Sequence, residues 1–210
     1  MNKILVITDM QNDFCPGGRL PTENGAGIIP NINALLNRGS FDRAIALQDW
    51  HPVGHISFAS AHPGKKPLDI IEAPYGEQQL WPDHCVQATK GADFHPLLDT
   101  RNIHFVVRKG YHLSVDSYSG FYENDKKTAT GMNGIIDQIA GGDPFLLVVC
   151  GIATDYCVIN TAMDAREILG YRNVVVPVDA CAGITPQSTE RALEEMSKAG
   201  VELVGTDTFL

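Results

Sequence analysis

The sequence predicts an α/β fold in which helices cover both faces of a mostly parallel, six-stranded sheet. Short β-branched runs alternate with segments of helical period along the whole chain. Several of these runs are apolar on both faces, as strands buried inside a parallel sheet must be. The 210 residues, of which 44% are apolar and 20% charged, suffice for one domain (residues 1–210) with a substantial core.

Short apolar runs along the chain are the expected strands. Helical segments connect these runs, except that the proline-rich segment of residues 49–95 follows the second run. Such connections between parallel strands are almost always right-handed. The sheet should therefore lie between two layers of helices. The expected strands are Lys3–Thr8, Arg43–Gln48, Ile103–Arg108, Pro144–Cys150, Asn173–Val178 and Val201–Val204.

Segments with apolar residues three or four positions apart are the expected helices, and each of them ends at a glycine. The last helix also has a start signal, because Thr185 at the cap position precedes Pro186 at the first helical position. The expected helices are Ile28–Arg38, Met132–Ile139, Asp155–Leu169 and the residues from Pro186 up to Gly200.

An excess of acidic residues, 25 Asp and Glu against 16 Lys and Arg, gives a formal net charge of −9. This charge disfavours binding to nucleic acid and to anionic membranes, which need a basic surface. No apolar stretch is long enough for a secretory signal or a bilayer crossing. Five cysteines without a secretory signal indicate reduced thiols in the cytoplasm rather than a disulfide framework. The sequence leaves the oligomeric state open, and a homo-oligomer is compatible with it.

Chemically active side chains follow four of the expected strands, at the edge where open α/β sheets bind ligands. Asp9 follows the first strand, Asp49 the second and Lys109 the third, and Cys157 comes shortly after the fourth. Each of them alone has an ordinary explanation as a turn former, a surface charge or a small buried residue. Their convergence at one edge favours a catalytic site.

Cys157 should lie in the first turn of a helix. A helix N-terminus and a nearby cation such as Lys109 lower the pKa of a thiol, which favours the nucleophilic thiolate. Asp9 could take the thiol proton and later give it to a leaving amine. The peptide N–H groups around Ala153 and Cys157 could donate to an oxyanion.

Asp49, His51 and His84 form a second cluster, independent of the first. Residues 49 and 51 lie on the same side of an extended backbone, and His84 would complete a set of two histidines and one carboxylate. Such a set suits Zn, Mn or Fe, and His55 could join it. The spacing is equally compatible with histidines that only form hydrogen bonds in loops. A metal site would make the proline-rich segment of residues 49–95 a metal-binding loop segment.

Several longer motifs follow one another along nearly the whole chain. They are DMQNDFCPGG (Asp9–Gly18), QDWHPVGHISFAS (Gln48–Ser60), LWPDHCVQ (Leu80–Gln87), GADFHPLLD (Gly91–Asp99), RKGYHLSVDSYSGF (Arg108–Phe121) and CGIATDYCV (Cys150–Val158). In this order and density they resemble the nicotinamidase branch of the isochorismatase-like cysteine hydrolases. The resemblance implies a Rossmann-like three-layer α/β/α fold and hydrolysis of nicotinamide to nicotinate and ammonia, a reaction of NAD salvage.

The resemblance also implies roles for individual residues. It implies a cis peptide bond before Ala153, and one divalent metal ion, with Zn the first expectation and Fe or Mn the alternatives. The metal would position the pyridine ring of nicotinamide, the expected small-molecule partner, and pyrazinamide should also be accepted. By motif, the catalytic triad falls on Asp9, Lys109 and Cys157, the oxyanion donors on Ala153 and Cys157, the metal ligands on Asp49, His51 and His84, and the aromatic walls on Phe14, Trp81 and Tyr118.

Two other functions share parts of this pattern. Related enzymes hydrolyse isochorismate or other amide and ureido substrates, but they generally lack the Asp-x-His pair with a distant histidine. A noncatalytic module that binds a metal or a metabolite has no need of a thiol at a helix start, paired with an aspartate and a lysine.

Overall fold

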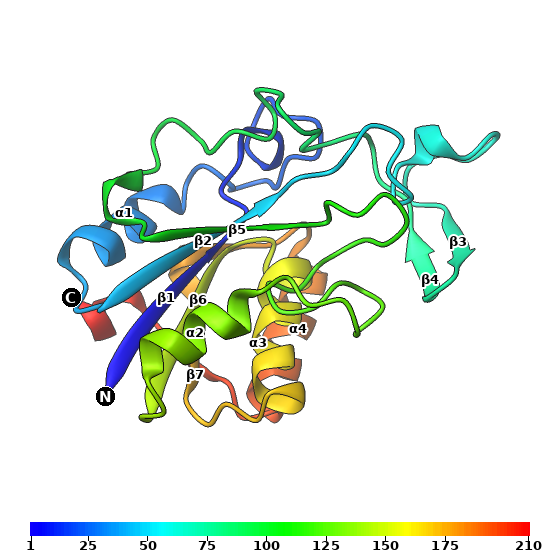
Figure 1. Ribbon diagram of the computed structural model, residues 1–210. Coiled ribbons are helices and arrows are strands. Elements are labelled where there is room, and N and C mark those ends of the chain that lie inside the picture. The colour runs from blue at the N-terminus through cyan, green and yellow to red at the C-terminus, as the bar shows by residue number, and fades with distance from the viewer.

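The computed structural model describes residues 1–210 and contains a parallel sheet with helices on both faces (Figure 1). The strands follow the order β5-β2-β1-β6-β7-β9, with every pairing along it parallel, and the short strand β8 pairs with β6. The predicted strands are all present, and β8 is an addition to them. The bounds are β1 Asn2–Thr8, β2 Arg43–Asp49, β5 Phe105–Lys109, β6 Phe145–Ile152, β7 Val174–Pro177, β8 Cys181–Ala182 and β9 Glu202–Val204.

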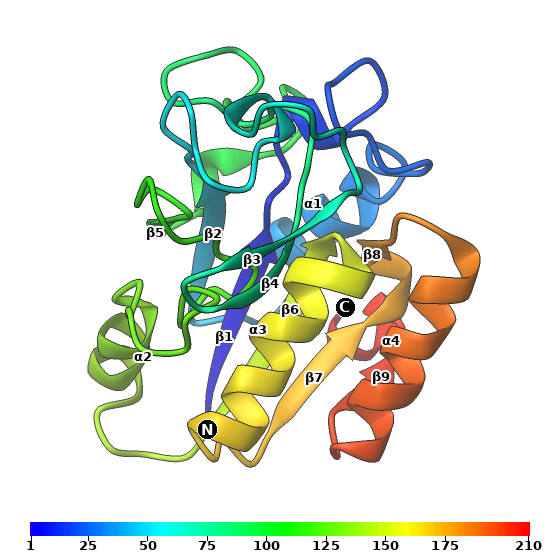
Figure 2. The same cartoon turned by 90° about the vertical axis from the view of Figure 1, so that its right-hand side faces the viewer.

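The helices cover both faces of the sheet, as predicted (Figures 1 and 2). Alternate residues of β1 supply the two cores: Leu5 and Ile7 pack on the side of α1, whereas Ile4 and Val6 pack on the side of α2, α3 and α4. A strand with a helical layer on each face must be apolar at every position. The α-helices are α1 Ile29–Arg38, α2 Met132–Ala140, α3 Ile159–Met163 and α4 Pro186–Lys198.

The ends of these helices follow the signals in the sequence. At the start of α4, the Thr185 side chain accepts a hydrogen bond from the Ser188 N–H at 3.1 Å. The helical segment after β6 is continuous from Thr154 to Ile168; α3 forms its central part, and the turns on either side of α3 are π-helical. No helix combines the length and the apolar character that a bilayer crossing needs.

The long segment between β2 and β5 contains an antiparallel hairpin, which the sequence does not indicate. Its strands are β3 (Ile70–Ala73) and β4 (Gly76–Gln79), and it projects from one side of the molecule (Figure 1). Because β4 reads Gly-Glu-Gln-Gln, it lacks the β-branched and aromatic residues that usually indicate a strand. Short 3₁₀ turns interrupt the rest of the segment.

The strand order reverses between β1 and β6. From β1 the chain moves outward to β2 and β5, and it then returns to β6 on the other side of β1. Ligands of open α/β sheets bind at such a reversal, outside the carboxyl ends of the strands. Asp9 directly follows β1, and β6 leads into the helical turn that carries Cys157.

Candidate active site

The ammonium group of Lys109 lies at the centre of a cluster of buried polar groups. It is 2.9 Å from Asp9 Oδ2 and 3.4 Å from Cys157 Sγ. It also donates to Asp49 Oδ1 and, at 3.1 Å, to the Ser117 carbonyl. Lys109 and Asp9 are fully buried, and Cys157 is 7% exposed. The fold therefore brings the three residues predicted as a triad into mutual reach from three different elements.

The same ammonium joins the two clusters that the sequence suggests are separate. Asp49 and Lys109 are direct partners in the register of the neighbouring parallel strands β2 and β5, and their side chains form an ion pair. The two predicted clusters, of which the strand-end group already included Asp49, are therefore in direct contact. The reason is the strand pairing, which sequence spacing does not reveal.

Burial and the Lys109 charge set the protonation of the two carboxylates in opposite ways. Burial raises the pKa of Asp9 to about 6, although Lys109 acts to lower it. Burial acts in the same direction on Asp49, but Lys109 and then His51 outweigh it and hold the pKa of Asp49 well below its usual range. For Lys109, the two carboxylates outweigh burial and keep its pKa well above the usual range.

The Cys157 thiol differs from its predicted state. Burial, followed by the Asp9 carboxylate, raises the pKa of the thiol well above its ordinary value, and the opposing effect of Lys109 is smaller. The predicted lowering of this pKa is therefore wrong, because burial and the Asp9 charge outweigh the effect of Lys109. A protonated thiol needs a base. Asp9 is available, since its carboxylate oxygens accept no well-aligned hydrogen bond.

Asp49, His51 and His84 converge in a geometry that fits a metal ion. The Nε2 atoms of His51 and His84 lie 3.5 and 3.9 Å from Asp49 Oδ2, and all three residues are buried. Their Nδ1 atoms lie 2.8 Å from the carbonyl oxygens of Gly110 and Pro82, respectively. Only a protonated nitrogen can donate to a carbonyl, so in the neutral form of each ring Nε2 keeps its lone pair, as metal ligands require. The group could therefore bind a divalent metal ion.

His55 does not belong to this ligand group. It lies near His51 and Asp116, with possible ligand atoms within 4.8 Å of one another, and its ring is 4.3 Å from the His51 ring. Its Nδ1 is 2.7 Å from Ser57 Oγ, however, and its Nε2 is 3.1 Å from the Val115 carbonyl. Both ring nitrogens of His55 therefore have hydrogen-bond partners, and its ring packs beside that of His51.

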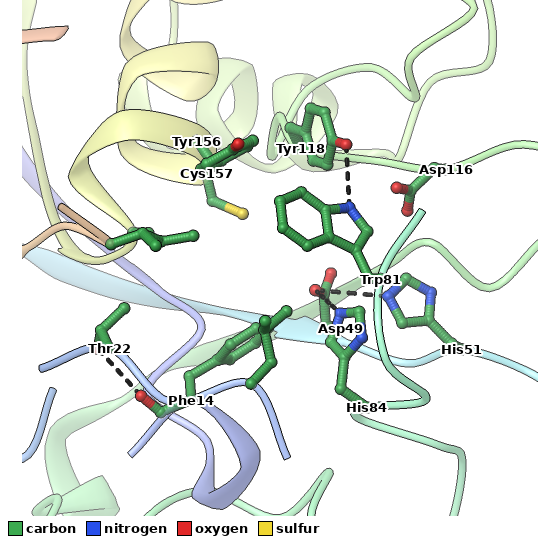
Figure 3. A pocket seen from close by; sticks show the side chains of 13 residues that line it. Phe14, Thr22, Asp49, His51, Trp81, His84, Asp116, Tyr118, Tyr156 and Cys157 are labelled. Carbon is green, nitrogen blue, oxygen red and sulfur yellow. Dashed lines mark hydrogen bonds and ion pairs between the residues drawn. The ribbon is translucent and has the colours of Figure 1, made fainter. Parts of the chain in front are cut away.

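A pocket lies between the thiol and the candidate metal ligands (Figure 3). The Trp81 indole N–H donates to the Tyr118 hydroxyl at 3.1 Å, and Tyr156 contacts Trp81 edge to face at 5.0 Å. The peptide bond between Ile152 and Ala153 is cis. The lining residues are Phe14, Leu20, Thr22, Asp49, His51, Trp81, His84, Asp116, Tyr118, Ala153, Tyr156, Cys157 and Ile184.

Comparison with known proteins gives the family of this chain. A model of the isochorismatase domain matches residues 3–208. The chain belongs to the isochorismatase family. Within this family it is similar to the nicotinamidase of Acinetobacter baylyi, to which it is 45% identical over 210 residues, covering 100% of this chain and 95% of the relative.

Two solved structures of the family are also similar to this chain. One is a nicotinamidase and pyrazinamidase of Acinetobacter baumanii, which is 44% identical with a TM-score of 0.92, covering 100% of this chain and 98% of the other. The second is the pyrazinamidase of Pyrococcus horikoshii in complex with zinc. It is 33% identical with a TM-score of 0.74, covering 98% of this chain and 99% of the other.

The pocket contains residues that the sequence alone did not single out. Tyr156 directly precedes Cys157, and Asp116 lies two positions before Tyr118, so their proximity to predicted site residues was a usable signal. Leu20, Thr22 and Ile184 are ordinary apolar or hydroxyl residues in loops and carry no such signal. Two predicted residues, Asp9 and Lys109, lie behind the pocket wall rather than on it.

Proposed function

We propose that this member of the isochorismatase family is a nicotinamidase that hydrolyses nicotinamide to nicotinate and ammonia. The observation that carries the proposal is that Lys109 contacts both the Cys157 thiol and Asp49 of the Asp49–His51–His84 group, and that one pocket borders the thiol and this group. Full-length similarity to nicotinamidases supports it. The nicotinate would return to NAD synthesis in the cytoplasm, and the protein would work as a single domain with a metal-binding segment at residues 49–95.

In this mechanism Asp9 is the base and acid, and Cys157 is the nucleophile. Asp9 takes the Sγ proton, and the thiolate adds to the amide carbon. The C–N bond then breaks, and ammonia leaves with the proton that Asp9 returns. Water adds to the thioester carbon as Asp9 takes its proton, and the C–S bond breaks to release nicotinate and regenerate the thiol.

Lys109 and two peptide N–H groups would stabilise the negative charges that develop in these steps. The Lys109 ammonium keeps Asp9 in place at 2.9 Å and limits the rise of its pKa. The N–H groups of Ala153 and Cys157 would donate to the oxyanion. Each such donor is typically worth about 10²–10³ in rate.

Asp49, His51 and His84 would hold one divalent metal ion, with zinc the first choice and iron or manganese the alternatives. When bound, such an ion offers a coordination position to the pyridine nitrogen and so orients the ring. The chain itself contributes the flat walls: the rings of Phe14 and Trp81 border the pocket and would pack against the pyridine ring.

Measuring ammonia release from nicotinamide by the purified, metal-loaded enzyme tests the proposal directly. Isochorismate and N-carbamoyl compounds are assayed as alternative substrates, because other members of the family act on compounds of these classes. Cys157→Ala should abolish turnover, and mass spectrometry of the wild type should trap an acyl adduct on Cys157. The absence of nicotinamide hydrolysis would refute the proposed function, and an adduct on Cys15 or Cys85 would refute the assigned nucleophile.

A further inference from the structure

Gln78 does not line the pocket but contacts two residues that do. It lies on β4 of the hairpin, and it is only 1% exposed. Its side-chain Nε2 is 3.0 Å from Asp116 Oδ2 and 3.2 Å from the Tyr118 hydroxyl oxygen. The same nitrogen is 2.6 Å from the Gln79 carbonyl. A buried polar side chain on a polar hairpin thus reaches the wall of the candidate substrate site.

The surroundings of Gln78 fix the orientation of its amide. Acceptors surround Nε2, whereas donors surround Oε1: the Tyr75 hydroxyl lies at 3.0 Å and the Asn124 Nδ2 at 3.4 Å. Turning the amide over would place its oxygen against the Asp116 carboxylate. Because both ends are matched and buried, losing either set of bonds leaves polar groups without partners.

The network continues from Gln78 to the aromatic wall. The Tyr118 hydroxyl accepts hydrogen bonds from Gln78 Nε2 and from Trp81 Nε1, and the Tyr118 N–H donates to Asn124 Oδ1 at 3.0 Å. Gln78 therefore links the hairpin to the loop that carries Tyr118. Within residues 116–118, the hydrogen bond to the triad is the one that the Ser117 carbonyl accepts from Lys109.

We propose that Gln78 is a positioning residue for the substrate ring, acting through Tyr118 and Asp116. The inference rests on the proposed nicotinamidase function. A wall held by hydrogen bonds is already ordered before the substrate arrives, so that binding need not immobilise it. Without Gln78, part of the binding energy would be used to order the wall, and the substrate would bind more weakly while the reacting groups stay in place.

The Gln78→Met variant tests this role, because it removes the amide and keeps the length of the side chain. We expect KM for nicotinamide to rise about tenfold, the effect of losing one to two hydrogen bonds, with kcat within about threefold of wild type. Glu77→Met, at an exposed position on the same strand, is the matched control and should change neither constant. A merely structural role would lower the fraction of active enzyme, and hence kcat, at constant KM; that result would overturn the proposal.

A double-mutant cycle with Tyr118→Phe tests the route of the effect. If Gln78 acts through the Tyr118 hydroxyl, the double variant should raise KM by less than the product of the two single increases. A KM equal to that product would contradict the proposed route.

If Gln78→Met does not fold, Gln78→Asn serves instead, since it keeps the amide but withdraws it by one methylene. Nicotinamide turnover by the wild type tests the function separately, so an active wild type with unchanged KM in the Gln78 variants refutes only the positioning role.

Discussion

Replacing Lys109 by methionine should destabilise the protein strongly. The substitution keeps the apolar part of the side chain but removes the ammonium that neutralises two buried carboxylates, Asp9 and Asp49. Removing one partner of a buried ion pair typically costs about 3–5 kcal/mol, because the remaining charge is left without compensation. For a chain of this size, that loss lowers the melting temperature by roughly 6–20 °C.

The loss should also depend on pH in a defined direction. Burial already raises the pKa of Asp9 to about 6 with Lys109 present, and the variant loses the charge that opposes this rise. A carboxyl group whose pKa is higher in the folded state stabilises the fold at low pH, and this contribution is lost as the pH rises through the folded-state pKa. The stability difference between wild type and Lys109→Met should therefore be larger at pH 8 than at pH 5.

Chemical denaturation at pH 5 and pH 8, with a chelator present so that no metal compensates Asp49, measures both effects. Lys90→Met, at an exposed position, is the matched control and should stay within about 0.5 kcal/mol of wild type. A Lys109→Met variant within about 1 kcal/mol of wild type at pH 8 would show that the ammonium is not the main counterion of these carboxylates. A stability difference that grows on acidification would contradict the assigned charge states.

Other predictions concern acid–base chemistry, the metal and the substrate ring. Because Asp9 must be ionised to accept the thiol proton and its pKa is about 6, kcat/KM should fall tenfold per pH unit below that value; a flat profile from pH 7 to pH 5 would exclude Asp9 as the base. Elemental analysis should find less bound metal in Asp49→Ala, His51→Ala and His84→Ala, but not in the control His104→Ala, at an exposed position outside the pocket lining. Pyrazinamide, which keeps a ring nitrogen meta to the carboxamide, should be hydrolysed, whereas benzamide and the 2-carboxamide isomer of nicotinamide should be poor substrates. A kcat/KM for benzamide within a few-fold of that for nicotinamide would show that the ring nitrogen is not recognised.

The strands and helices of the main sheet could be predicted because their signals are local. A continuous apolar run such as that in β1 indicates a strand buried on both faces, and Thr185 before Pro186 indicates the start of α4. The hairpin of β3 and β4 could not be predicted in this way. Its polar strand β4 is held in place by contacts with the distant loop at residues 116–124, and no pattern within β4 records those contacts.

The sequence by itself also indicated that Asp9, Asp49, Lys109 and Cys157 lie at one edge, because strand ends at the switch point of a parallel sheet converge there. Only the tertiary structure decided how these residues act on one another. The pairing of β2 with β5 places Lys109 against Asp49, burial raises the pKa of the Cys157 thiol, and both ring nitrogens of His55 form hydrogen bonds. Charge states and hydrogen-bond partners depend on burial and on distances between side chains far apart in the chain. The periodicity and spacing of a sequence contain neither quantity.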